Sequence, residues 1–207
     1  PVQVTNGADP AGGVGSSADG RTILYAQDKT VTDFWIVNIA ENRARQITFT
    51  DEMQFLPYFS PDGSQIAFVA VGGNNSSHIF VMDRDGSNRR QLSFGDETVD
   101  QAPRWSPDGG RIAYGARRTT EPLDSIRTYI LDVFKAGPAR RIAPGYPGTW
   151  IDSTRLPVYV NARAYITTIE GVSLAPIADD STNAFIVVGG KYIIYRDLRQ
   201  GRDTTTW

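Results

Sequence analysis

The sequence contains no cysteine and only one histidine, His78, among its 207 residues. The absence of cysteine excludes disulfides, thiolate metal sites and a cysteine nucleophile. A single histidine cannot supply a zinc site of the usual Cys/His type or a metal site held by several histidines. Carboxylates, the ligands that Ca²⁺ and Mg²⁺ prefer, are therefore the remaining route to a metal site in this chain.

Long hydrophobic runs, excess charge and catalytic motifs are also missing. No apolar run approaches the roughly 18 residues that span a bilayer, and the formal net charge is −2. No G-x-S-x-G nucleophile elbow is present. Residues 13–18 fit the dinucleotide pattern G-x-G-x-x-A, but a turn and a strand follow them instead of a helix. We expect no nucleic-acid partner, no direct membrane insertion and no catalytic constellation.

What the sequence does contain is a repeat of about 45 residues. Its marker is a tight turn at residues 17–20, 60–63 and 106–109, with aspartates at 19, 62 and 108, at intervals of 43 and 46 residues. Proline presets φ in such turns and glycine permits a positive φ. Each turn precedes an alternating apolar segment, and two further short segments complete the repeat, so each repeat predicts four strands.

Third strands are expected at 33–39, 78–83 and 127–133, and fourth strands end at Thr48, Ser93 and Ala143. The aromatic residues before the turns, Phe59 and Trp105 among them, are expected to pack between adjacent sheets. A weaker copy follows, in which Trp150 lies 45 residues after Trp105. We place the repeats at about 14–48, 55–93, 103–143, 148–178 and 184–207, the last incomplete.

The opening W/F-S-P-D-G-x-x-I-A-F/Y, followed by an I-F-V-M-D strand, an Asp-Gly turn and R-x-L-T/S, resembles the WD40-like blade of TolB-type β-propellers. The resemblance is clearest over residues 14–143. It implies an all-β propeller of four-stranded antiparallel blades, with about four to five blades present. Residues 1–5 resemble the fourth strand of a preceding or shared blade. The end strands either share a blade and close a five-bladed ring or, as we favour, belong to a longer, six-bladed ring.

The resemblance also implies a function. We expect a non-catalytic scaffold or sensory domain that binds a protein or peptide partner, in the periplasm or another extracytoplasmic compartment. The alternative is the gating propeller domain of a prolyl-oligopeptidase-type serine peptidase whose catalytic domain is absent here. A G-x-S-x-G elbow elsewhere in the parent polypeptide would favour the peptidase, because the blade motif specifies fold and not activity.

Up-and-down strand order divides the connections between two faces. We call the face with the blade-to-blade links and the second-to-third-strand loops the link face, and the face with the remaining turns the turn face. The links are rich in acids and the opposite turns and fourth strands in arginine, so we expect an acidic link face and a basic turn face. Four link acids are candidates for a ring at the channel mouth: Glu52, Asp96, Glu97 and Asp100.

Such a ring would attract a cation, Ca²⁺ being the one cofactor considered, or a basic partner segment. Solvated link residues without a ligand are the alternative. The second-to-third-strand loops differ most between repeats, and variable loops on a rigid scaffold commonly carry recognition. The candidate contact residues in or beside these loops are His78, Arg117, Arg118 and Glu121.

Overall fold

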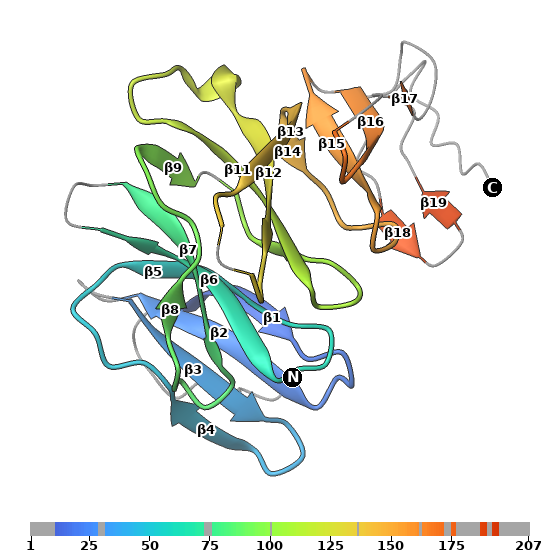
Figure 1. Cartoon of the computed structure of the whole chain (residues 1–207). Helices are drawn as coiled ribbons and strands as arrows, with labels where there is room; N and C mark the ends of the chain where they lie inside the picture. Colours follow the sequence, from blue (N-terminus) through green and yellow to red (C-terminus); the bar gives the residue numbers. More distant parts are fainter. Residues whose placement is uncertain are drawn as a thin grey trace, which may run out of the picture.

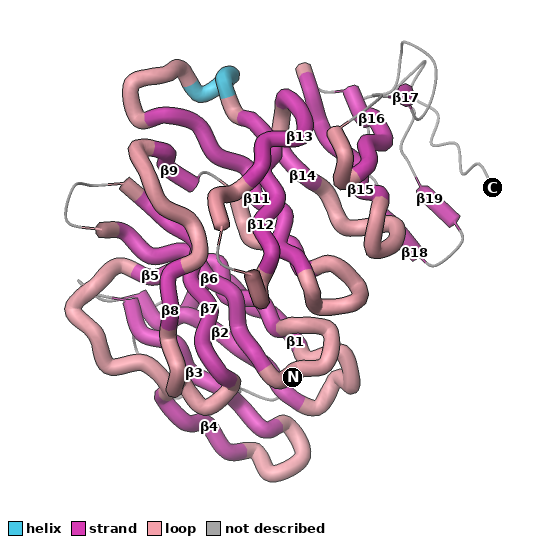
Figure 2. The backbone as a smooth tube through the Cα atoms, viewed as in Figure 1, coloured by secondary structure: helices cyan, strands magenta, loops and turns pink. Residues whose placement is uncertain are grey.

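The computed structural model describes residues 11–28, 32–72, 76–99, 101–135, 137–161, 163–171, 175–176, 187–189 and 192–194. Over these ranges nearly all regular structure is β-strand, and the single helix is the short 3-10 turn η1 (Leu123–Ser125) (Figure 2). No helix in the described ranges is long and apolar enough to cross a membrane.

The strands form successive antiparallel sheets in chain order, which we call blades one to four. Blade one contains β1 (Ala11–Ser16), β2 (Thr22–Asp28), β3 (Thr32–Asn38) and β4 (Arg43–Gln46). Blade two contains β5 (Gln54–Phe59), β6 (Gln65–Val71), β7 (Ser77–Asp83) and β8 (Arg90–Gln91). Blade three contains β9 (Glu97–Val99), β10 (Arg104–Trp105), β11 (Arg111–Arg118), β12 (Arg127–Asp132) and β13 (Arg140–Pro144).

Blade four and a further strand pair complete the described chain. Blade four contains β14 (Tyr146–Pro147), β15 (Arg155–Val160), β16 (Arg163–Thr168) and β17 (Ala175–Pro176), and the pair contains β18 (Val187–Gly189) and β19 (Tyr192–Ile194). In blade three, β9 and β10 both pair with β11 and together take the place of the first strand, so the prediction of an all-β propeller with four-stranded antiparallel blades is confirmed. The strand expected at residues 1–5 lies outside the described residues.

First strands lie at the centre of the arrangement, because β5 contacts both β1 and β10. Fourth strands β4, β8 and β13 form the opposite edge of each sheet (Figure 1). On the left of Figure 1, β9 and the β11–β12 loop lie on the link face, and the first-to-second-strand turns of blades two and three lie on the right. Loops, turns and the short strand β9 therefore form the two faces, and changes in these connections need not alter the longer strands.

Three apolar cores fill the spaces between consecutive blades. In the core between blades one and two, Phe34 and Phe68 meet edge to face with 5.3 Å between ring centroids. The tryptophans before the turns lie between blades, as expected: Trp105 Nε1 donates to the Tyr58 carbonyl at 3.1 Å, and Trp150 Nε1 donates to the Arg104 carbonyl at 2.9 Å. Each indole therefore adds a hydrogen bond to the apolar contact between two sheets.

The S-x-D-G turns repeat the same hydrogen bonds in three blades. The Oγ atoms of Ser17, Ser60 and Ser106 donate to the aspartate two residues later at 2.5–2.6 Å. These bonds are the main cause of the lowered pKa values of Asp19, Asp62 and Asp108. The aspartates that mark the repeat are therefore charged and structurally engaged.

Substituting Gly86 should destabilise the protein much more than substituting Gly20. Both have positive φ, +95° and +67°, but a Cβ on Gly86 would lie 2.0 Å from the Ile47 carbonyl oxygen, whereas one on Gly20 meets nothing within 4 Å. Gly20→Ala should cost about 1 kcal/mol for the left-handed backbone, and Gly86→Ala roughly 1–3 kcal/mol more for the clash. Urea unfolding of both variants measures the difference, and equal losses would show that blades one and two do not approach so closely.

Candidate functional site

The link face of blades two and three gathers several candidate residues around β9. This short strand pairs with the end of β11, so that Glu97 lies opposite Arg118. Ser77, at the start of β7, connects the two blades: its Oγ lies 2.8 Å from Thr98 Oγ1 and donates to the Val99 carbonyl at 2.8 Å. The link and the second-to-third-strand loops therefore form one continuous surface here.

Glu121 holds the longest of these loops in place. Its carboxylate accepts two hydrogen bonds from Arg127, at 2.5 and 3.0 Å, and one from the Arg118 backbone N–H at 3.1 Å. The bonds from Arg127 and then Arg118 lower the pKa of Glu121 to about 2. Arg117 donates to the Glu121 carbonyl at 2.8 Å. Three of the candidate loop residues are thus brought together as a preformed surface.

His78 lies beside this cluster on β7 and is half-buried. Burial lowers its pKa, although the charge of Glu97 acts in the opposite direction. Its Nε2 lies 3.1 Å from Ser76 Oγ. On the neighbouring blade, burial and then the hydrogen bond and charge of Glu97 raise the pKa of Tyr129 to about 12. The Tyr129 phenol, which belongs to the core between blades two and three, is therefore uncharged at neutral pH, and burial favours the uncharged form of His78.

The link acids that the structure describes have separate neighbours, and their arrangement as a ring stays a prediction. Glu52 forms an ion pair with Arg89, whose guanidinium also lies 4.5 Å from the Phe80 ring centroid. Asp96 lies 3.7 Å from Arg118, Glu97 lies near Tyr129, and Asp100 lies outside the described residues. Within the described ranges, no three Asp, Glu, His or Cys side chains are placed to hold a metal ion. The calcium hypothesis stays a prediction.

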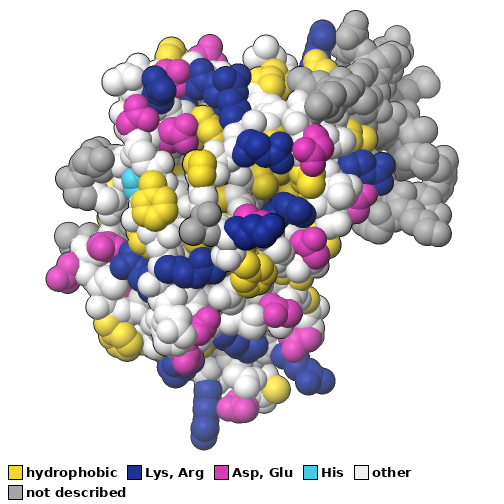
Figure 3. Space-filling view, viewed as in Figure 1, with side chains coloured by type: hydrophobic (Ala, Val, Ile, Leu, Met, Phe, Trp, Pro, Cys, Tyr) yellow, Lys and Arg dark blue, Asp and Glu magenta, His cyan; other side chains and the backbone are white. Residues whose placement is uncertain are grey.

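Charge does not separate by face as we expected from the sequence. The link face also carries Arg118 and Arg127, and the turn face carries Asp62, Asp85 and Asp108. Figure 3, which looks toward the fourth strands, shows basic side chains interspersed with acidic ones. Neither face therefore presents charge of a single sign.

Exposed apolar side chains on the link face were missed in the sequence. Phe49 and Phe94 follow the fourth strands of blades one and two and are 77% and 68% exposed. Leu123, in the loop that Glu121 anchors, is 70% exposed. A signal was present, because F-T-D-E and F-G-D-E recur at the same place in successive links. The site therefore combines exposed phenylalanine side chains at equivalent positions with neighbouring carboxylates.

Consecutive four-stranded sheets with their first strands at the centre define a β-propeller. Residues 1–144 match the TolB beta propeller domain family, and the chain belongs to that family. The chain is 30% identical over 123 residues to the uncharacterized protein Atu1656 of Agrobacterium fabrum, covering 55% of this chain and 42% of the relative.

Two further relatives have names that indicate different roles. The Tol-Pal system protein TolB of Anaeromyxobacter dehalogenans is 35% identical over 88 residues, 42% of this chain and 20% of the relative. The uncharacterized peptidase YuxL of Bacillus subtilis is 27% identical over 86 residues, 42% of this chain and 13% of the relative. The chain thus spans less than half the length of each of these curated relatives.

Solved propellers share the fold at low sequence identity. The putative TolB from Agrobacterium tumefaciens superposes with a TM-score of 0.71 at 15% identity, covering 98% of this chain and 82% of that chain. TolB from Acinetobacter baumannii gives 0.66 at 18% identity, covering 97% and 54%. At these identities the similarity shows the fold alone.

Removing the guanidinium of Arg127 should raise the pKa of Glu121 from about 2 toward 4.5, the ordinary value of a glutamate side chain. Because the pKa is depressed in the folded protein, Glu121 contributes stability above its unfolded-state pKa, and this contribution is lost as the pH falls toward 2. Carboxyl ¹³C NMR of the Arg127→Met variant measures the shift, with Arg43→Met on β4 as the control. An unchanged Glu121 titration would contradict the assigned ion pair.

Calcium binding can be tested on the protein directly. If the link acids hold Ca²⁺, millimolar CaCl₂ should raise the thermal unfolding temperature relative to EDTA, because a ligand that binds the folded state stabilises it. Replacing Glu52, Asp96, Glu97 and Asp100 with their amides should abolish the increase, and NaCl at the same ionic strength serves as the control. No increase in the unmodified protein would reject the calcium hypothesis.

Proposed function

We propose that this chain is a non-catalytic β-propeller domain that binds a protein or peptide partner on its link face. The repeated exposure of Phe49 and Phe94 is the observation that carries the proposal. Exposed aromatic residues are costly to hydrate and are enriched in protein interfaces. Their equivalent positions in adjacent blades place them one blade apart on the same face, which suits an extended contact.

The surroundings of the two phenylalanines favour a partner with basic residues around an apolar segment. Each phenylalanine precedes a pair of acids, Asp51 with Glu52 and Asp96 with Glu97. Arg89 and Arg118 neutralise part of this charge, so the acids support orientation and encounter more than affinity. Leu123 extends the apolar contact onto the loop that Glu121 and Arg127 hold in one conformation.

Family membership supports the same class of function. One relative is named as the TolB of a Tol-Pal system, and the proposal for this chain accordingly includes a periplasmic or other extracytoplasmic location. The scaffold or sensory role is inferred from two observations: the link face has exposed side chains suited to recognition, and the sequence has no catalytic constellation.

The second candidate is a propeller domain that gates a serine peptidase. The similarity to YuxL, named as a peptidase, favours it. In that case the parent polypeptide would contain a G-x-S-x-G elbow with later Asp and His residues, and the full protein would hydrolyse peptide substrates. Sequencing the parent polypeptide distinguishes the two candidates.

The link-face proposal predicts that Phe49→Ser combined with Phe94→Ser weakens partner capture at least about tenfold, since aromatic anchors commonly dominate an interface. Both side chains are largely exposed, so the fold should be retained. Partners cross-linked to the protein in an extract of the source organism are identified and quantified by mass spectrometry. The matched control is Ile39→Ser, on the turn face and 44% exposed.

The control variant should capture the partner as the unmodified protein does. Equal capture by the double variant and the unmodified protein would contradict a link-face interface. Loss of capture in Ile39→Ser alone would place the interface on the other face.

A further inference from the structure

The turn face contains a series of equivalent positions between neighbouring blades. The residue after each third strand donates its backbone N–H to the same turn: Ile39 to Arg21, Arg84 to Ser64 and Val133 to Gly110, at 2.9–3.0 Å. Arg84 and Val133 are therefore structural equivalents in blades two and three. Their side chains take different positions: Arg84 extends across a junction between blades, whereas Val133 packs in a core. The groove between two blades differs accordingly.

Between blades one and two, the protein's own Arg84 occupies this position. Its Nη2 donates to Thr22 Oγ1, and its guanidinium carbon lies 5.6 Å from the Phe59 ring centroid. Its Nη1 lies 3.8 Å from where a Cβ on Gly63 would stand. Its charge also helps to lower the pKa of Asp19, after the hydrogen bonds from Ser17 and Arg21. A guanidinium is thus accommodated by a hydroxyl, an aromatic ring, a glycine turn and a carboxylate.

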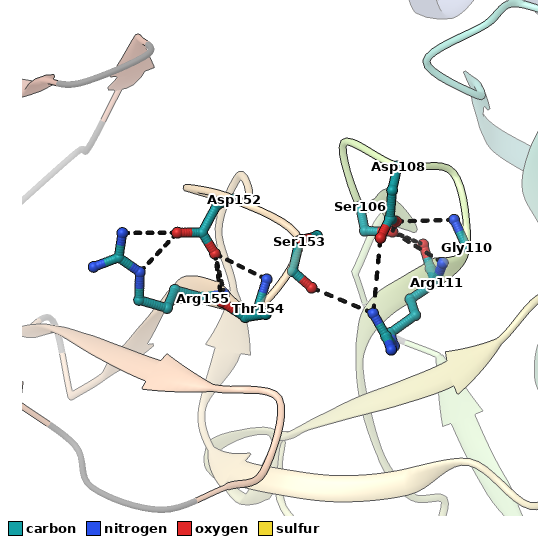
Figure 4. Close-up of polar contacts among 8 residues, drawn as sticks. All are labelled: Ser106, Asp108, Gly110, Arg111, Asp152, Ser153, Thr154 and Arg155. Carbon is teal, nitrogen blue, oxygen red and sulfur yellow. Dashed lines mark hydrogen bonds and ion pairs between the residues drawn. The ribbon is translucent and has the colours of Figure 1, made fainter.

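Between blades three and four another arginine of the chain bridges the turns. Arg111 Nη1 donates to the Ser153 carbonyl at 3.4 Å and lies 3.9 Å from Asp108 Oδ2 (Figure 4). The turn that it reaches is held by Asp152, which accepts hydrogen bonds from the backbone and side chain of Thr154 at 2.8 Å. Two of the three junctions therefore contain a guanidinium from the chain itself.

The junction between blades two and three differs. It forms a groove of about 430 Å³ whose described lining includes no lysine or arginine. Val133, the equivalent of Arg84, is only 1% exposed and packs in the core between these blades. Arg111's equivalent here is Gln65, which donates to Asp83 Oδ1 at 3.4 Å instead of crossing to the next turn.

The lining of this groove matches the surroundings of Arg84 position by position. Gln65 stands where Thr22 stands, Trp105 where Phe59 stands and Gly109 where Gly63 stands, and all three line the groove. Phe134, 75% exposed, adds a second aromatic ring. An aromatic face and nearby oxygen acceptors are the features that bind a guanidinium.

The groove is also more acidic than the junction that holds Arg84. Asp62, Asp83 and Asp108 all line it. Asp62 and Asp108 are engaged in their turns, and Asp83 accepts from Asn88 Nδ2 at 2.6 Å. At the place of Asp83, blade one has the uncharged Asn38. Neutral donors hold Asp62 and Asp83, whereas Asp108 also lies 3.9 Å from Arg111, so the groove favours a cation on the Asp83 side.

We propose that this groove binds an arginine side chain of a partner protein, with the guanidinium over the Trp105 indole and beside Asp83. This contact is a second one, on the face opposite Phe49 and Phe94, and it does not depend on the link-face interface. Arginine is preferred to lysine because its planar guanidinium can stack on the indole and donate to several oxygens in one plane.

Acetylarginine amide is the probe that tests the groove. Titration into the protein should shift the Trp105 indole N–H signal saturably in ¹H–¹⁵N NMR spectra, with the signal assigned through Trp105→Phe. Acetylcitrulline amide, an uncharged analogue of similar shape, should bind at least about tenfold more weakly, because it lacks the charge that the rings and carboxylates attract. The affinity of Nα-acetyllysine amide, whose ε-amino group is free and charged, should fall between those of the arginine and citrulline probes.

Two variants examine the contacts separately. Gln65→Arg should fill the groove with the protein's own guanidinium, as Arg111 does at the next junction, and weaken probe binding at least about tenfold; Gln91→Arg on β8 adds the same charge elsewhere and should have little effect. Asp83→Asn reproduces Asn38 and should weaken binding about fivefold, as expected for the loss of one exposed ion pair. Thermal unfolding verifies that each variant is folded.

An unmoved Trp105 signal, equal binding of the citrulline analogue, or full binding by folded Gln65→Arg would each overturn the proposal. The outcome is independent of the partner-capture experiment, because neither Phe49 nor Phe94 lines this groove. A failed titration with normal capture would reject the arginine groove alone, and the reverse would reject the link-face interface alone.

Discussion

Each blade depends on its neighbours because both faces of its sheet are apolar. Strand β6 shows this directly: Ile66 and Phe68 belong to the core shared with blade one, whereas Ala67 and Val69 belong to the core shared with blade three. Since successive side chains of a strand point to opposite faces, one seven-residue strand contributes to two cores. A single blade would leave one of these faces in water, so the packing is cooperative along the chain.

This requirement determines where sequence can vary. Residues within β6 and β11 have neighbours on both sides, while residues at the strand ends contact turns, links and solvent. The link face therefore has room for exposed Phe49 and Phe94, for the anchored loop with Glu121, and for ion pairs that differ from blade to blade. The proposed recognition surface and the apolar cores therefore lie in different parts of the same repeat.

The sequence predicted the fold because its signals are local. Turns such as residues 60–63 have specific chemistry, and their spacing indicates a repeat of known size. The candidate site was only partly predictable, since ion pairing joins distant segments: Glu52 meets Arg89, 37 residues away. The F-T-D-E and F-G-D-E links could have been recognised from the repeat, but their exposure depends on what the neighbouring blade covers. The role of Val133 required the structure, because valine turns inward where Arg84 extends across a junction.

The contrast between Arg84 and Val133 has a consequence for how repeat proteins acquire new contacts. In a duplicated blade, an arginine that crosses a junction acts as a tethered ligand for the neighbouring repeat. Where the equivalent position holds Val133 instead, the complementary surface is present without a tethered ligand. A binding surface for an external side chain can thus use geometry that the repeat already requires for folding.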